Sequence, residues 1–449
     1  MSHQTTTTEL PVVVIGAGPS GLAAAAHFRG RDVDVLVLES GPAAGAAVTQ
    51  WGHVRLFSAW SELIDPAGEK LLADAGWTPP NAKRYPTGAE WVSGYLQPLA
   101  DVLGDSVRYG TTVTSVAKQS RDRLVSSGRD DAPFTVHVLS PTGAGHIQAR
   151  AVVDASGTWT GPNPLGGDGV VAIGEAEAAD HISYRIPDLQ NATERARYAG
   201  KHVVVAGTGA SAKGALIGLT ALAKDEPNTR VTWLVRRSNI GAAFAGSGQD
   251  ELPQRGALGQ QAQAAVAEGP VTTLNGFRTS KVSTGSDGRL IIESFDNQIV
   301  EGVDEVVVLT GFRPNLEMLS EVRLDLDPVL QAPRQLAPLI DPNEHSCGTV
   351  YPHGAKELAQ PETGFYLVGM KSYGRATSFL ALTGFEQTRS VAAAIAGDHE
   401  AAARVELTLP ETGVCGGSGL FDDETAETGG CCGTAAEPEL ITLGRPGPQ

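Results

Sequence analysis

The sequence predicts an α/β protein built from two doubly wound, three-layer domains. A buried strand, a glycine-rich turn, an apolar helix and a second strand follow one another twice, about 190 residues apart. The first unit comprises residues 11–15, 16–21, 22–28 and 34–39. The second unit comprises residues 201–206, 207–212, 215–223 and 230–236. Of the 449 residues, 41% are hydrophobic and 19% are charged, so the chain can bury a core for two such Rossmann-like domains.

The overall charge excludes one large class of function. Lys and Arg number 34 against 51 Asp and Glu, which gives a net charge of −17 and argues against a nucleic-acid binder. The longest apolar run, 22–28, is too short to span a membrane. The first eleven residues lack the basic and apolar regions of a signal peptide, so we expect a cytoplasmic protein without a membrane partner.

The first glycine-rich turn has the spacing of a dinucleotide-binding fingerprint, G-x-G-x-x-G. Gly16 permits the tight turn, Gly18 lets the backbone approach a pyrophosphate, and Gly21 allows close packing of helix on strand. The helix N-terminus, which includes Ser20, then offers free N–H groups to the phosphates. Glu39 ends the second strand, where a carboxylate can accept hydrogen bonds from ribose hydroxyls. This fingerprint predicts a dinucleotide site, which the family resemblance described below assigns to FAD.

The second glycine-rich turn predicts a site for NADPH. Gly207 and Gly209 are followed by Ser211 and by Ala212, an accepted variant of the third glycine. The next strand ends in Arg236-Arg237 and not in an acid. A guanidinium binds a 2′-phosphate, which an acid would repel, so the pair favours NADP(H) over NAD(H). The alternative is that the two arginines form only a solvated surface patch.

The rest of the chain is divided by glycine- and proline-rich crossovers. We predict a strand at 151–155 before the crossover at 161–164, and a strand at 303–309 before the crossover at 310–315. A last strand and helix are predicted at 364–369 and 384–396, followed by a polar tail. The predicted domains are 1–160 and 310–400 for the two parts of the first domain, 161–309 for the second, and 401–449 for the tail.

The chain resembles flavoproteins with two dinucleotide-binding domains. The resemblance lies in the order of its motifs, which are GAGPSG, Glu39, ASGTW, GTGASA, Arg236-Arg237 and LTGFRPN. This family includes the flavin-containing monooxygenases and the thioredoxin reductases. The resemblance covers residues 10–400 and implies an NADPH domain inserted into the FAD domain. It further implies a set of FAD contacts beyond the fingerprint: Trp51, Gly157, Thr310, Gly311, Gly384 and Glu386. Many relatives have Gly-Asp after the last strand, where this chain has Gly369-Met370.

The cysteines separate two branches of this family. Disulfide reductases need a cysteine pair facing the flavin, but Cys347 is the only cysteine among residues 1–400. Residues 50–58 and 158–164 instead resemble segments of the monooxygenases, although the linker fingerprint around His181 is degraded. We therefore expect a divergent monooxygenase, with Trp51, Arg55 and Asp65 as candidate catalytic residues.

The resemblance implies that NADPH reduces the flavin and that the reduced flavin reacts with O2 to form a C4a-(hydro)peroxide. That species would oxygenate a small molecule with a soft sulfur, nitrogen or trivalent arsenic atom. Trp51, Trp60, Trp77 and Trp91 lie in one segment and could exclude water from such a site, although ordinary packing explains at least two of them. The resemblance also allows a homodimer.

The tail contains the other three cysteines, Cys415, Cys431 and Cys432. Soft thiolates select thiophilic ions, so we consider these residues a candidate site for As(III) or a similar metalloid. A body of this type with a cysteine-rich end resembles flavoproteins of arsenic-resistance operons, and the tail resembles that of mercuric reductases. Two alternatives stay open: a reductase that passes electrons to the tail cysteines, and a metalloid-binding redox sensor. The cysteines could also be incidental to a polar tail.

Overall fold

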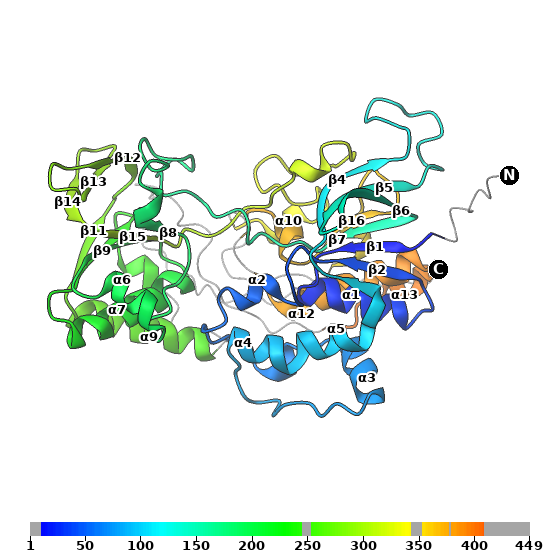
Figure 1. Cartoon of the computed structure of the whole chain (residues 1–449), viewed down its shortest axis with the longest axis horizontal. Helices are drawn as coiled ribbons and strands as arrows, with labels where there is room; N and C mark the ends of the chain where they lie inside the picture. Colours follow the sequence, from blue (N-terminus) through cyan, green and yellow to red (C-terminus); the bar gives the residue numbers. More distant parts are fainter. Residues whose placement is uncertain (1–9, 245–252, 343–352, 377–378, 408–449) are drawn as a thin grey trace, which may run out of the picture.

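The computed structural model describes residues 10–244, 253–342, 353–376 and 379–407, which form two lobes (Figure 1). One lobe contains elements from both ends of the described chain, and the other contains its middle. Each lobe is built on a five-stranded parallel sheet. The predicted fold class, with one dinucleotide-type domain inserted into another, is therefore confirmed. The exact domain boundaries stay a prediction.

The sheet of the first lobe has the strand order β16-β7-β1-β2-β3. Its strands are β1 (Val12–Ile15), β2 (Val35–Leu38), β3 (Val107–Arg108), β7 (Ala151–Asp154) and β16 (Phe365–Leu367). Every residue of β1, β2 and β7 is buried, as expected for central strands that are covered on both faces. The carboxyl ends of these strands meet at one edge of the sheet, which we call the cofactor edge.

Two different layers cover this sheet. Val12 and Val14 face a helical layer, and Val13 and Ile15 face a small antiparallel sheet, because successive strand residues point to opposite faces. The helices are α1 (Pro19–Arg29), α3 (Pro66–Asp74), α5 (Gln97–Leu103) and α12 (Ala381–Ile395). The antiparallel strands are β4 (Thr112–Lys118), β5 (Phe134–Ser140) and β6 (Gly143–Ala149). Helices α1 and α12 lie side by side although they come from opposite ends of the chain.

The second lobe repeats this plan with the strand order β11-β10-β9-β15-β8. Its strands are β8 (Ile182–Ser183), β9 (His202–Ala206), β10 (Arg230–Val235), β11 (Val271–Asn275) and β15 (Glu305–Val308). Its helices are α6 (Ala192–Tyr198), α7 (Ala210–Asp225) and α9 (Pro253–Glu268). The antiparallel layer consists of β12 (Thr279–Thr284), β13 (Leu290–Ser294) and β14 (Ile299–Val303).

Short helices complete the two lobes. The short α-helices are α2 (Ala46–Thr49), α4 (Gly88–Trp91), α8 (Gly241–Phe244), α10 (Ala337–Ile340), α11 (Ala355–Leu358) and α13 (His399–Ala403). The 3-10 and π helices are η2 (Trp60–Glu62), η3 (Val92–Leu96), η4 (Gly104–Ser106), η5 (Ala179–His181), η6 (Glu317–Leu319) and η7 (Gly369–Tyr373). Within the described ranges, no helix has both the length and the apolar composition needed to cross a membrane.

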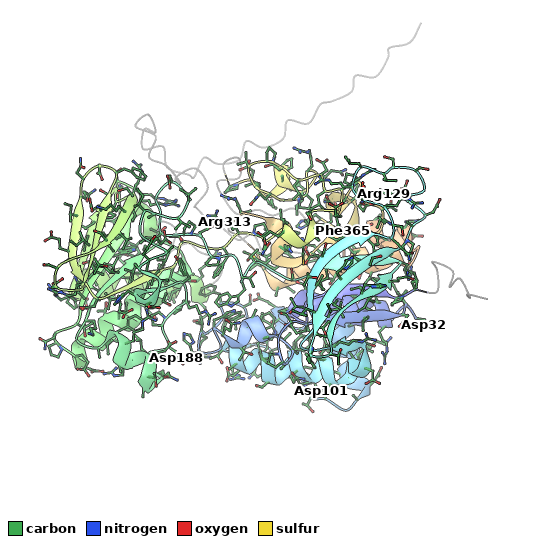
Figure 2. All side chains as sticks on the ribbon, turned by 45° about the horizontal axis from the view of Figure 1, so that its top comes forward. Asp32, Asp101, Arg129, Asp188, Arg313 and Phe365 are labelled. Atoms are coloured by element: carbon green, nitrogen blue, oxygen red, sulfur yellow. The ribbon has the colours of Figure 1, made fainter. Side chains whose placement is uncertain are left out.

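Two linkers join the lobes and pair with each other where they cross. The N–H of Arg313 donates to the carbonyl of Gly161 (2.8 Å), and the N–H of Asn163 donates to the carbonyl of Gly311 (2.9 Å). The Arg313 side chain also binds Oδ1 of Asn163 (2.8 Å) and the carbonyl of Gly169 (2.9 Å). Figure 2 shows Arg313 at the narrow junction between the lobes. The crossing is therefore a hydrogen-bonded ribbon and not two independent loops.

Candidate active site

The first fingerprint turn has the geometry that a dinucleotide site needs. Gly16 has φ +97°, and a Cβ on Gly21 would lie 1.9 Å from the Gly16 carbonyl oxygen. A Cβ on Gly18, in contrast, would meet no atom within 4 Å. Gly16 and Gly21 therefore serve the turn and the helix packing, and Gly18 faces open space that a pyrophosphate can fill.

Helix α1 begins directly at this space. Its N-cap is Gly18, no side chain caps its first N–H groups, and its first turn contains no acidic residue. Uncapped N–H groups at the N-terminus of a helix of this length bind phosphate well. These residues fit the FAD pyrophosphate.

Glu39 lies just beyond β2 and is almost completely buried. Its Oε2 accepts from the N–H of Ala17 (2.8 Å), and its Oε1 accepts from the N–H of Gly41 (2.7 Å). These two bonds orient the carboxylate at the cofactor edge. Oε1 also accepts from the Ser40 hydroxyl (3.4 Å), whereas Oε2 keeps a further lone pair with which it can accept from a ribose hydroxyl.

The N-terminus of α12 meets that of α1 at Ser20. A Cβ on Gly384 would lie 2.7 Å from the Ser20 hydroxyl oxygen, and a Cβ on Gly369 would lie 2.5 Å from it. Gly384 therefore lies beside the fingerprint, as the proposed contact with FAD requires. Glu386 is differently placed: its carboxylate binds Arg389 (2.7 Å) and accepts from the N–H of Glu406 (3.3 Å). Glu386 thus binds the end of the described chain, a role that the sequence did not suggest.

The second fingerprint turn repeats the geometry of the first. Gly207 has φ +119°, and a Cβ there would lie 2.3 Å from the carbonyl oxygen of Leu309. A Cβ on Gly209, the N-cap of α7, would meet no atom within 4 Å. Ala212 is fully buried against the sheet, and Ser211 is half-buried in the first turn of α7. The residues of this turn therefore have the geometry needed to bind a second dinucleotide.

Three arginines gather near the end of β10. The pKa of Arg236 is lowered because neighbouring protein atoms displace part of the water around its guanidinium, and then because of the charges of Arg237 and Arg278. A guanidinium binds a phosphate through two parallel hydrogen bonds, so guanidinium groups gathered at the end of this strand fit a 2′-phosphate. Arg278 was not predicted from the sequence. It follows β11 by three residues, and only the parallel pairing of β10 with β11 brings it here.

Three of the predicted FAD contacts lie on the linkers or next to them. The Thr310 hydroxyl donates to the carbonyl of Asn163 (3.1 Å), and Gly311 has φ +95°. Gly157 has φ +69°, and a Cβ there would meet no atom within 4 Å. Gly157 is thus an open backbone position near the junction, whereas a Cβ on Gly311 would lie 3.4 Å from Nδ2 of Asn163. The contacts of both glycines with FAD stay a prediction.

An aromatic pair at the junction was also missed. The rings of Trp159 and Phe312 stack with centroids 5.0 Å apart, one from each linker. The indole N–H of Trp159 donates to Oε1 of Gln50 (3.1 Å), which neighbours Trp51. The sequence offers a basis for predicting this contact, because both aromatic residues lie in the motifs that mark the two linkers between the lobes.

The three candidate catalytic residues are not equivalent. Asp65 is fully buried, where it caps α3 through the N–H of Gly68 (2.9 Å) and binds Nε2 of His27 (2.9 Å). Arg55 is exposed, and its guanidinium donates to the carbonyl of Tyr85. Trp51 is half-buried against Gly88, where a Cβ would lie 2.8 Å from its ring. The geometry favours a structural role for Asp65 and leaves Trp51 available to line the site.

The other tryptophans of this segment serve the core. Trp60 and Trp91 are buried, and Trp91 donates to the carbonyl of Leu63 (2.9 Å). Trp77 donates to the carbonyl of Gly94 (3.1 Å). His181 is an exposed residue whose Nδ1 donates to the carbonyl of Asp304 (3.0 Å), so it contributes to the surface of the second lobe.

The four cysteines of the chain lie outside the described residues; they are Cys347, Cys415, Cys431 and Cys432. Within the described part, no group of three or more His, Cys, Asp or Glu side chains is arranged to hold a metal ion. The metalloid site in the tail thus stays a prediction.

Two dinucleotide turns of this shape, one per lobe, define an oxidoreductase that combines a flavin with a nicotinamide nucleotide. Residues 13–347 match the family described as pyridine nucleotide-disulphide oxidoreductases, and the chain belongs to this family. The resemblance to flavoproteins with two dinucleotide-binding domains is thereby confirmed. FAD and NADPH are the cofactors of this chain.

The relatives include reductases and monooxygenases. The chain is 25% identical over 324 residues to a ferredoxin–NADP reductase of Halalkalibacterium halodurans, a match that covers 70% of this chain and 77% of the relative. Its fold is similar to that of the bacillithiol disulfide reductase of Bacillus cereus (TM-score 0.63, 18% identity, 86% of this chain and 99% of that chain). It is also similar to a flavin-containing monooxygenase of Stenotrophomonas maltophilia (TM-score 0.53, 20% identity, 86% of this chain and 98% of that chain). At these identities the two structures establish a shared fold.

Proposed function

We propose that this protein is a cytoplasmic NADPH-dependent FAD monooxygenase that oxygenates a soft sulfur, nitrogen or trivalent arsenic atom of a small molecule. The observation that carries the proposal is the pairing of two dinucleotide turns with a body that lacks a cysteine pair. Residues 1–400 contain one cysteine, Cys347, so the body has no dithiol to receive electrons from the flavin. Oxygen is the acceptor that remains. In balance, NADPH, a proton, O2 and the substrate give NADP⁺, water and the oxygenated substrate.

The chain would bind and orient both nucleotides. The N-terminus of α1 and Glu39 would hold the FAD pyrophosphate and ribose, and Arg236, Arg237 and Arg278 would hold the 2′-phosphate of NADPH. FAD, when bound, supplies the hydride acceptor and the reaction with O2. Trp51 and the Trp159–Phe312 pair would line the junction and exclude water, which would otherwise favour wasteful release of H2O2.

A stoichiometric assay tests the proposal. The FAD-loaded protein is mixed with NADPH and one of three probes: a thioether, a tertiary amine or a trivalent methylarsenical. NADPH consumption, O2 consumption and H2O2 release are measured together. We expect one probe to lower the H2O2 released per NADPH well below the value without a probe, with a matching amount of oxygenated product. Complete conversion of O2 to H2O2 with every probe contradicts the proposal.

A reductase is the second candidate, and it is favoured by the family and by the two reductases among the relatives described above. Electrons would pass from the flavin to Cys431 and Cys432 and then to a disulfide or a bound metalloid. This candidate predicts that Cys431→Ser with Cys432→Ser abolishes turnover and leaves flavin reduction by NADPH intact. A metalloid-binding sensor is distinguished from both by tight As(III) binding with negligible NADPH consumption. The association with arsenic, like the homodimer, rests on the family resemblance.

A further inference from the structure

A buried charged cluster at the cofactor edge has no part in the function described so far. The ammonium nitrogen of Lys371, in η7, lies 2.7 Å from Oδ2 of Asp154 and 2.9 Å from the hydroxyl oxygen of Ser156. The side chains of Lys371 and Asp154 are only 1% and 0% exposed. We call Lys371, Asp154 and Ser156 the lysine cluster.

Stability alone is a weak reason for such a pair. Removing two charges from water costs several kcal/mol per ion, and apolar residues of similar volume often serve as well or better. A charged pair buried this deeply therefore suggests a role in positioning a neighbouring group.

The cluster lies directly behind the FAD fingerprint. Asp154 ends β7, which pairs with β1, and a Cβ on Gly16 would lie 3.2 Å from the Cα of Ser156. Lys371 reaches the same point from η7, whose first residue, Gly369, neighbours Ser20. The lysine cluster thus connects the end of β7, the end of β16 and the turn at Gly16.

Asp154 fixes the shape of the loop 155–157. Its Oδ1 accepts from both the N–H (3.0 Å) and the hydroxyl (2.6 Å) of Ser156, which is an Asx-type turn. Ser156 is exposed, and Gly157 faces open space. The loop therefore packs against the turn at Gly16, beside the open space at Gly18, and its anchor is a carboxylate that Lys371 neutralises.

We propose that Lys371 is a positioning residue for FAD, which acts through Asp154 and Ser156 to hold the loop 155–157 against the pyrophosphate turn. Without the ammonium, the carboxylate of Asp154 would be a buried, uncompensated negative charge behind a site for a diphosphate. The carboxylate would repel the cofactor and would turn toward water, and the loop would move with it. The proposal concerns FAD binding and is independent of whether oxygen or a disulfide is the acceptor.

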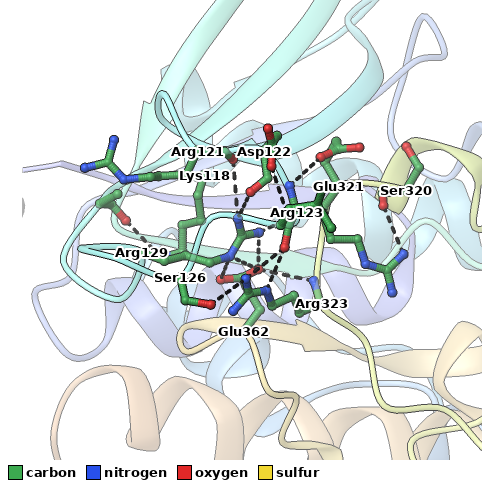
Figure 3. A network of polar contacts seen from close by, with 12 residues as sticks. Lys118, Arg121, Asp122, Arg123, Ser126, Arg129, Ser320, Glu321, Arg323 and Glu362 are labelled. Carbon is green, nitrogen blue, oxygen red and sulfur yellow. Dashed lines mark hydrogen bonds and ion pairs between the residues drawn. The ribbon is translucent and has the colours of Figure 1, made fainter.

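The structure offers a matched control at the other end of β16. Arg129 and Glu362 form a second buried pair (2.6 Å), with side chains 2% and 1% exposed. Glu362 precedes β16, whereas Lys371 follows it, so the second pair lies at the opposite edge of the sheet. Arg129 donates to the carbonyls of Asp122 and Glu321, and Glu362 accepts from the N–H of Arg323, so the pair joins the loop before β5 to residues 321–323 (Figure 3). Removing the charge of Arg129 is therefore expected to destabilise the same domain at a point away from the cofactor edge.

The experiment compares FAD affinity in two parallel series. The first series is Lys371→Met and Lys371→Met with Asp154→Asn. The second series is Arg129→Met and Arg129→Met with Glu362→Gln. The dissociation constant of FAD is measured by titrating each apoprotein and following the quenching of flavin fluorescence, and circular dichroism reports folding. The dissociation constant of NADP⁺, which binds the other lobe, is the internal control.

We expect Lys371→Met to weaken FAD binding about 10- to 100-fold, the range for losing hydrogen bonds to a charged group. The Asp154→Asn change should restore most of the affinity, since an amide oxygen can still accept from the Ser156 N–H. Arg129→Met should leave FAD binding within about twofold, because its pair lies far from the phosphates. A folded Lys371→Met protein with unchanged FAD affinity overturns the proposal, as does an equal loss in Arg129→Met.

A surface variant keeps the test usable if Lys371→Met does not fold. Ser156→Ala removes the hydroxyl that joins Lys371 directly to the loop, and it leaves the buried pair and the bond from the Ser156 N–H to Asp154 intact. We expect it to fold and to weaken FAD binding by roughly three- to tenfold, as for one lost hydrogen bond. An unchanged FAD affinity in Ser156→Ala contradicts the proposed path from Lys371 to the loop.

Discussion

Gly161 and Arg313 lie backbone to backbone at the crossing of the two linkers, and a Cβ on Gly161 would stand 2.3 Å from the Arg313 carbonyl oxygen. The N–H of Arg313 donates to the Gly161 carbonyl at the same point (2.8 Å). The relative placement of the two lobes, and hence of the two cofactors, depends on this close approach. Only glycine permits it without moving a linker.

Gly161→Ala is therefore expected to slow flavin reduction without weakening nucleotide binding. A shift of the linker by about 1 Å misplaces the hydride donor, which can cost tenfold or more in rate. Anaerobic stopped-flow mixing with NADPH measures the rate. Gly214→Ala, in α7, is the control, because a Cβ there meets no atom within 4 Å and alanine favours a helix. An unchanged rate in Gly161→Ala would show that the linkers tolerate displacement.

The arginine patch should determine the choice of nucleotide. Arg236→Ala and Arg278→Ala are each expected to raise the KM for NADPH about 10- to 100-fold, as for a lost charge-assisted hydrogen bond, with little effect on the KM for NADH. Arg289→Ala is the control, since Arg289 is an exposed arginine of the same lobe that binds Asp287 in a turn. Equal losses with NADPH and NADH would assign the patch to folding and not to the 2′-phosphate.

Two glycines of the first fingerprint should fail in different ways. Gly18→Ala places a methyl group in open space, so we expect a normally folded protein that no longer binds FAD. Gly21→Ala places a methyl group 1.9 Å from the Gly16 carbonyl oxygen, so we expect α1 to move off the sheet and the protein to lose stability. Thermal unfolding and FAD titration separate the two. Normal FAD affinity in Gly18→Ala would exclude the phosphate from this turn.

Asp65 is expected to affect stability and not catalysis. Asp65→Ala removes an N-cap and leaves His27 without its buried partner, a loss of about 2–4 kcal/mol in the free energy of unfolding. Urea denaturation measures this loss, and Asp74→Ala at the exposed end of α3 is the control. A stable Asp65→Ala protein with a much reduced turnover would contradict the structural role and would support a catalytic role for Asp65.

The second lobe should lose stability in mild acid because of His202. Burial lowers the pKa of this residue in the folded protein, so the unfolded chain binds the proton more tightly. The stabilising neutral form is complete above about pH 6.5, the ordinary pKa of histidine, and stability falls as the pH drops below it. Unfolding monitored at pH 7.5 and 5.5 should show a smaller loss in His202→Gln than in the parent protein. His399→Gln, at an exposed position, should retain the full loss.

The sequence predicted both parallel sheets because glycine spacing and buried β-branched runs are local signals. The helix expected at 384–396, for example, lies at Ala381–Ile395. Arg278, the Trp159–Phe312 stack and the lysine cluster escaped prediction because each joins residues from strands or linkers far apart in the chain. Asp65 and Glu386 were proposed as site residues because of the segments in which they lie. In the structure Asp65 caps a helix and Glu386 forms an ion pair, and these contacts could not be read from the sequence.

The proposed reaction transfers an oxygen atom from O2 to the substrate, and labelled oxygen follows this transfer. The FAD-loaded protein is supplied with NADPH, the probe that best suppresses H2O2 release, and ¹⁸O2. Mass spectrometry then follows the product. We expect the oxygen atom that is added to the probe to derive from ¹⁸O2. Product oxygen that derives from water, or a product formed equally well without O2, would contradict the proposal.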